Sequence, residues 1–138
     1  MRLSTVVLGL TIAVSVSLCG CGKAGGADDI HASPTSIMRA AFQGYKDKDA
    51  ELIFKTMSPK MREKLAPQKD RIPYDKIDAW AKKVWGVPLS EVDTAKITLT
   101  IKKEENDRKY VDAVYNGKSY RDKAWVVKID GKWFIDRF

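Results

Sequence analysis

Thr94-Ala95-Lys96-Ile97-Thr98-Leu99-Thr100-Ile101-Lys102 is the stretch at which the chain changes from one sequence pattern to another. Apolar and polar side chains alternate along it, which is the pattern of a β-strand with one buried face. The pairs Asn116-Gly117 and Asp130-Gly131 follow, and both are favoured in two-residue type I′ hairpin turns because both central residues need positive φ. We therefore expect four antiparallel strands that form a meander, over residues 94–103, 109–115, 118–129 and 132–138.

Before this sheet, apolar residues recur at helical spacing behind helix-start signals. Ser33-Pro34 is typical of an N-cap and a first helical residue, and Asp49 and Ser58 can cap two further short helices. The first of these helices would bury Ile37, Met38, Ala41, Phe42 and Tyr45. A fourth helix is predicted from Pro73 to Gly86. One of its faces carries Ile77, Trp80, Ala81 and Val84. This order of elements predicts an α+β domain with its N-terminal helices packed on one face of the four-stranded meander.

The two hairpin turns also determine which side chains share a face of the sheet, because each turn sets the register of its strands. The face expected to pack on the helices carries Val111, Ala113, Tyr115, Tyr120, Ala124, Val126, Trp133 and Ile135. The opposite, outer face carries Tyr110, Asp112, Val114, Arg121, Lys123, Trp125, Val127, Ile129, Phe134 and Phe138.

The outer face is more apolar than a solvent-exposed face, and large apolar patches on a protein surface mark interaction sites. We predict a contact patch for a homodimer or an envelope partner, formed by Trp125, Val127, Phe134 and Phe138. The alternative is that a bulge shifts the register, or that the N-terminal segment or a helix folds over this face.

The N-terminal segment resembles a bacterial lipoprotein signal peptide. Residues 3–18 are apolar but short for a transmembrane span, and no charged flank follows them. Lipoprotein signals carry a Leu-type residue three positions before the lipidated cysteine and a small residue directly before it, as Leu18, Gly20 and Cys21 do here. The resemblance implies that residues 1–20 are removed and that Cys21 carries the lipid. An ordinary cleaved secretory signal is the alternative.

The processed chain would be basic and free of thiols. The net charge of +7 becomes +6 when Arg2 leaves, and of the two cysteines one is discarded and Cys21 is acylated. Residues 21–32 are small and polar, as in a flexible tether, and residues 33–138 suffice for one domain with one core. Gly22, in place of the Asp that retains such proteins at the inner membrane, favours the periplasmic side of an outer membrane in a cell that has one. An exported chain with dispersed positive charge is not expected to bind nucleic acid.

Several of these segments together resemble a known family. They are Ser33-Pro34, Lys48-Asp49, Met57-Ser58-Pro59 and the closing run Val127-Lys128-Ile129-Asp130-Gly131-Lys132-Trp133. The chain from residue 33 is similar to small bacterial lipoproteins bearing domain of unknown function 4878, which have the nuclear transport factor 2-like, cystatin-like superfold. The resemblance implies a curved sheet wrapped around helices as a cone, and it implies no activity because the superfold includes isomerases, dehydratases and binding modules. Phe134 departs from related sequences, which often carry a polar residue there.

Few residues offer chemistry. His31, the one histidine, falls in the predicted tether, so neither a catalytic pair nor a transition-metal site is expected, and no cofactor is predicted. The carboxylates that could act as acids or bases are Asp112, Asp122 and Asp136, with Tyr110, Tyr115 or Tyr120 as partners. The hairpin register favours a different role for Asp112, a cross-strand ion pair with Arg121. The acidic cluster Glu104-Glu105-Asn106-Asp107 lacks a calcium-loop pattern and is expected to be a solvated turn.

The function expected from the sequence is that of a membrane-anchored envelope lipoprotein that acts as a non-enzymatic binding or assembly module. The alternatives are a carrier or sensor of a small apolar ligand held in the cone, and an enzyme of the dehydratase or isomerase type. A cavity of ligand size with a buried carboxylate would favour these alternatives, whereas a filled cone with an apolar outer sheet face would favour the assembly module.

Overall fold

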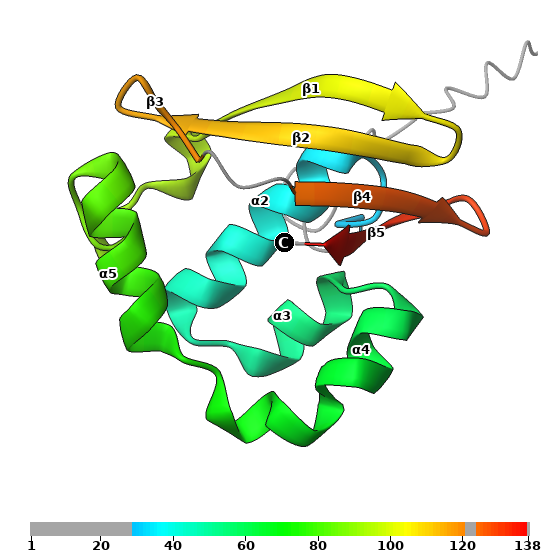
Figure 1. The fold of residues 1–138 in the computed structure, drawn as a ribbon, viewed down its shortest axis with the longest axis horizontal. Coiled ribbons are helices and arrows are strands. Elements are labelled where there is room, and N and C mark those ends of the chain that lie inside the picture. Colours follow the sequence, from blue (N-terminus) through cyan, green and yellow to red (C-terminus); the bar gives the residue numbers. More distant parts are fainter. Residues whose placement is uncertain (1–28, 121–123, 138) are drawn as a thin grey trace, which may run out of the picture.

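The computed structural model describes residues 29–120 and 124–137, and these form an α+β fold (Figure 1). The helices come first: α2 (Pro34–Asp47), α3 (Ala50–Thr56), α4 (Pro59–Leu65) and α5 (Tyr74–Trp85). Short 3₁₀ segments follow α4 and α5: η1 (Ala66–Arg71), η2 (Leu89–Glu91) and η3 (Thr94–Lys96). The strands are β1 (Thr98–Glu105), β2 (Arg108–Tyr115), β3 (Lys118–Ser119), β4 (Ala124–Ile129) and β5 (Lys132–Arg137).

The helix starts predicted from Ser33, Asp49 and Ser58 are confirmed. Their side chains accept hydrogen bonds from the backbone N–H groups of Ser36, Leu52 and Met61, at 3.0, 3.0 and 3.3 Å. The end of α5 is also confirmed, because Gly86 follows it with φ of 85°. Pro73, predicted to be the first residue of this helix, is its N-cap residue, and α5 begins at Tyr74.

The sheet differs from the predicted meander in where its strands begin and divide, and its register shifts between Ile101 and Lys103 and between Trp125 and Val126. Residues 94–96 form η3, because the Asp93 side chain accepts a hydrogen bond from the backbone N–H of Ala95 at 3.1 Å, and the strand therefore begins at Thr98. The predicted strand 118–129 is divided into β3 and β4, both of which pair with β2, so the described residues form a five-stranded sheet.

The register explains why this division leaves the faces unchanged. The Asn116-Gly117 turn pairs Val114 with Ser119, as predicted, but Tyr110 pairs with Trp125, two residues beyond the partner that an unbroken strand would give. A shift by two residues keeps each side chain on the same face, because side chains alternate with a period of two.

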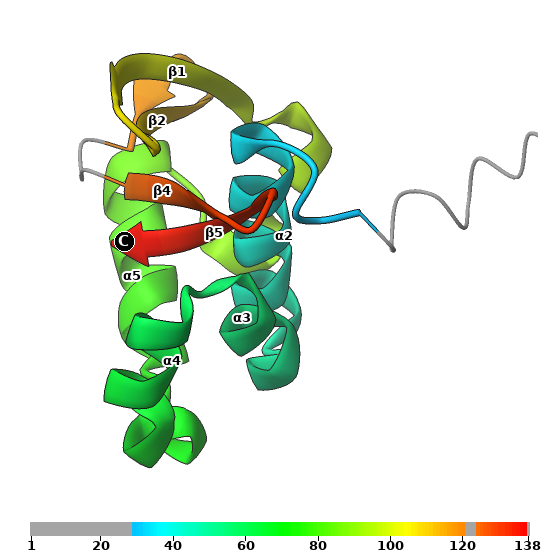
Figure 2. The ribbon, with the colours of Figure 1, turned by 90° about the vertical axis from the view of Figure 1, so that its right-hand side faces the viewer.

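The predicted core face is confirmed by burial. Of its eight members only Tyr115 is half-buried, and the others are buried. They pack against apolar residues of α2 and α5, chiefly Ile37, Met38, Phe42 and Trp85. Figures 1 and 2 show α2 behind the sheet and α3 and α4 beyond the edge formed by β5.

The open edge of β5 is covered by two other segments. The backbone N–H of Ser58 donates to the carbonyl of Ile135 at 2.8 Å, and the N–H of Trp133 donates to the carbonyl of His31 at 3.0 Å. His31 Nδ1 also lies 2.7 Å from the carbonyl oxygen of Trp133. His31, assigned to the tether on sequence grounds, therefore packs against the sheet, where it supplies partners that the backbone of an edge strand would otherwise lack.

Within the described residues, no helix combines the length and the hydropathy that crossing a bilayer requires.

Candidate binding cavity

An aromatic-lined cavity of about 300 Å³ opens between α2, α5 and the residue that follows β3. From α2 come Phe42 and Tyr45, and from α5 come Lys76, Ile77 and Trp80. Leu89 of η2 and Tyr120 complete the lining. Each of these helix residues is three or four positions from another lining residue of the same helix, so the helical period brings them toward the cavity.

Ring contacts hold the walls of this cavity. The ring of Trp80 lies 4.2 Å from that of Tyr120 and 5.6 Å from that of Trp85, and Phe42 lies 5.7 Å from Tyr120. The indole N–H of Trp85 donates to the carbonyl of Lys118 at 3.0 Å, which ties α5 to β3. Edge-to-face pairs of this kind and a buried indole hydrogen bond make the lining well defined.

The described lining of the cavity carries little charge. Among the lining residues that the structure describes, Lys76 alone carries a charge, and its side chain is exposed. Burial raises the pKa of the Tyr45 phenol above 10.0, with a smaller contribution from Tyr74, so this phenol is protonated at neutral pH. No carboxylate or histidine is among these lining residues, so they supply no general base of the usual kind.

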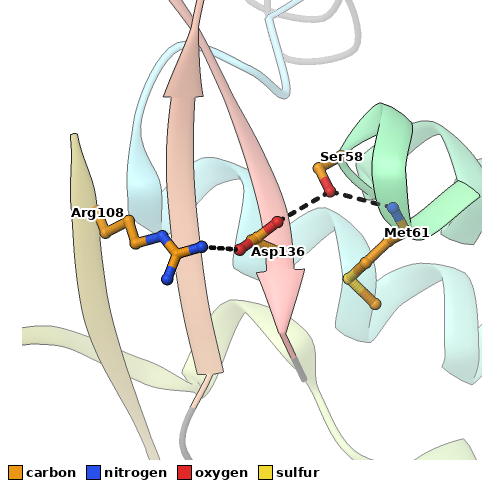
Figure 3. Close-up of polar contacts among 4 residues, drawn as sticks. All are labelled: Ser58, Met61, Arg108 and Asp136. Carbon is orange, nitrogen blue, oxygen red and sulfur yellow. Dashed lines mark hydrogen bonds and ion pairs between the residues drawn. The ribbon is translucent and has the colours of Figure 1, made fainter.

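The carboxylates that the sequence singled out lie elsewhere. Asp112 is buried on the outer face and accepts a hydrogen bond from Ser119 Oγ at 2.5 Å, while its predicted partner Arg121 lies outside the described residues, as does Asp122. Asp136 accepts one hydrogen bond from Arg108 at 2.7 Å and another from Ser58 Oγ at 3.2 Å (Figure 3).

The contacts of Asp136 join β2, β5 and the start of α4, so this carboxylate has a structural role. Of the tyrosines named as partners, the Tyr110 ring lies 5.8 Å from that of Trp125, the Tyr115 ring lies 5.7 Å from that of Trp85, and only Tyr120 lines the cavity. The structure therefore brings none of the described candidate carboxylates to the cavity.

The predicted contact patch on the outer face is half-buried. Trp125, Val127 and Phe134 all lie on this face with intermediate exposure, whereas Phe138 lies outside the described residues. The ring of Phe134 is 4.5 Å from the His31 ring and 5.9 Å from the Arg62 guanidinium carbon, so the N-terminal segment and α4 cover part of it. Cys21 also lies outside the described residues.

The acidic cluster at the β1–β2 turn is paired with neighbouring lysines. Glu104 lies 3.1 Å from Lys109, and Glu105 pairs with Lys103. Within residues 29–120 and 124–137, no group of three or more histidines, cysteines or acidic residues lies close enough together to hold a metal ion.

Comparison of the chain with models of protein families, with curated proteins and with solved structures finds no match. Sequence reasoning missed Lys76 as a cavity residue, since it is one of many lysines and only the packing of α5 against α2 distinguishes it.

Proposed function

We propose that the protein is a lipid-anchored binding module of the bacterial cell envelope, with a nuclear transport factor 2-like domain that holds a small apolar ligand and performs no reaction on it. Cys21, in its lipoprotein-type sequence, would carry the anchor, and the outer membrane facing the periplasm is its expected location in a Gram-negative cell. Several lipid chains on one cysteine would anchor the protein stably, whereas one chain binds only marginally.

The observation that supports ligand binding is the cavity between α2 and α5. Its volume of about 300 Å³ is at the lower end of the range for small-molecule sites, and its lining is mainly aromatic and aliphatic. The lack of a carboxylate or histidine among the described lining residues favours a carrier or sensor over a dehydratase or isomerase, which needs a positioned base.

The test uses the chain without residues 1–21, which retains every residue of the core cluster, Ile37 to Ile135. Fluorescence titration with the neutral probe N-phenyl-1-naphthylamine should give saturable binding. Ile77→Trp, which fills the cavity, should abolish this binding, and Ala79→Trp on the exposed side of the same helix should not. No saturable binding to the wild type, or equal binding to the Ile77→Trp variant, would refute the proposal.

A second candidate is an assembly module that binds through the outer sheet face. It is supported by Trp125 and Val127, which point away from the core and are only half-buried. In this case a second copy of the chain or another envelope protein would cover them. Sedimentation and affinity purification of the lipidated protein should then detect self-association or a partner that Trp125→Ser with Phe134→Lys removes, and unchanged behaviour of this double variant would exclude the patch.

A further inference from the structure

We propose that the cavity takes a small carboxylic acid with an apolar body, whose carboxylate pairs with Lys76 at the mouth while the body lies among the aromatic side chains. This proposal rests on the proposed ligand-binding function and names its ligand class. It follows from the position of one cation on an otherwise uncharged lining.

Lys76 is placed to bridge the cavity and the solvent. It lies in the first turn of α5, four residues before Trp80, and residues at this spacing share a face of a helix. Because it both lines the cavity and is exposed, its aliphatic stem can extend the apolar wall while the ammonium group stays in contact with water.

Lys76 has no ion-pair partner within the described part of the chain, so its ammonium group is available to an external anion. Lys69, Lys103 and Lys109 each pair with a glutamate, whereas Lys76 makes no ion pair with a described residue. The neighbouring acids on α5, Asp75 and Asp78, are not among the described lining residues, and Asp78 accepts a hydrogen bond from the backbone N–H of Ser90 at 3.2 Å.

Two interactions would strengthen the binding of an anion beside Lys76. The Lys76 ammonium group attracts a carboxylate, and this attraction is modest because the side chain is exposed to water. Lys76 also lies at the N-terminal end of a 12-residue helix, where the partial positive charge of the helix favours an anion. A neutral ligand with the same apolar body gains neither contribution.

The experiment compares two ligands of the same shape, 1-naphthylacetate and 1-naphthylacetamide, by isothermal titration calorimetry on the chain without residues 1–21. The acid should bind about threefold to fivefold more tightly than the amide, as expected for an ion pair with an exposed ammonium group. Lys76→Met should lower the affinity for the acid to that for the amide and leave the amide unchanged. Lys76→Arg should keep the preference, and it also controls for folding.

Lys82→Met is the matched control, because it removes the same charge from an exposed position of the same helix that does not line the cavity. It should bind both ligands as the wild type does. Equal affinity for the acid and the amide, or an equal loss in the Lys76→Met and Lys82→Met variants, would overturn the role of Lys76 while the cavity remains. Failure of both ligands and of N-phenyl-1-naphthylamine would instead overturn the proposed function itself.

Discussion

Replacing Ser58 by alanine should cost more stability than replacing any other helix-capping serine of the described chain. Ser58 is 1% exposed and its hydroxyl makes two contacts, accepting from the backbone N–H of Met61 and donating to Asp136 (Figure 3). The variant therefore removes a helix cap and leaves a half-buried carboxylate with one partner fewer.

The expected loss follows from these two contacts. Loss of an N-cap costs about 1 kcal/mol. A hydrogen bond to a charged group contributes about 1.5 kcal/mol, at the low end of its range here because Asp136 keeps Arg108. Ser58→Ala should thus lower the free energy of unfolding by about 2–3 kcal/mol.

Ser33→Ala is the matched control, because the Ser33 hydroxyl bonds only within the first turn of α2. Its cost should be about 1 kcal/mol. Urea unfolding followed by tryptophan fluorescence measures both, and with a slope of about 1.5 kcal/mol/M the midpoints should fall by about 1.7 M and about 0.7 M. A double-mutant cycle with Asp136→Ala should give a coupling energy of about 1.5 kcal/mol. Equal losses for the two serine variants, or a coupling below about 0.5 kcal/mol, would refute the reasoning.

Three further changes probe other parts of the chain. Gly44→Ala should lower the free energy of unfolding by about 1–2 kcal/mol in urea titrations. The added Cβ would lie 2.9 Å from Ile53 Cγ1, and the cost of this overpacking exceeds the gain of about 1 kcal/mol in helix propensity. An unchanged urea midpoint would contradict this close approach. The pKa of Tyr45 is raised in the folded state, so its contribution to stability is complete below pH 10.0 and is lost as the pH rises further. Tyr45→Phe should therefore reduce the difference in urea midpoint between about pH 9 and about pH 11. An equal difference in the wild type and the Tyr45→Phe variant would contradict this expectation. Cys21→Ser should move the protein from the detergent phase to the soluble fraction on phase separation, and continued membrane association would contradict lipidation at this residue.

Local signals in the sequence predicted the helices and the two faces of the sheet. Ser33, Asp49 and Ser58 act through neighbours three residues away, and the alternation of side chains needs only the strand itself. The division of residues 118–129 into two strands was missed, because a break in a strand depends on how β4 aligns along β2 and not on its own residues.

The cavity likewise could not be predicted from local sequence patterns. Its lining comes from α2, α5, η2 and Tyr120, which are far apart in sequence, and each of these residues taken alone resembles an ordinary core or surface residue. Trp80 lies on the apolar face of the predicted fourth helix, and its half-buried state becomes apparent only when α5 is docked. The contact between His31 and β5 could not be foreseen either, because polar flanking residues carry no signal for backbone pairing at a sheet edge.

The contact of His31 with β5 also affects how a lipid-anchored domain would be oriented at a membrane. Only seven residues lie between Cys21 and Asp29, and a fully extended chain spans about 28 Å over these eight Cα–Cα steps. A lipid on Cys21 would therefore hold the His31 end of the domain next to the headgroups. Figure 2 shows α5 on the opposite side of the domain from the blue segment that precedes α2, so the cavity would face the water-filled compartment. A ligand would then reach the cavity by diffusion through that compartment and not by lateral transfer from the bilayer.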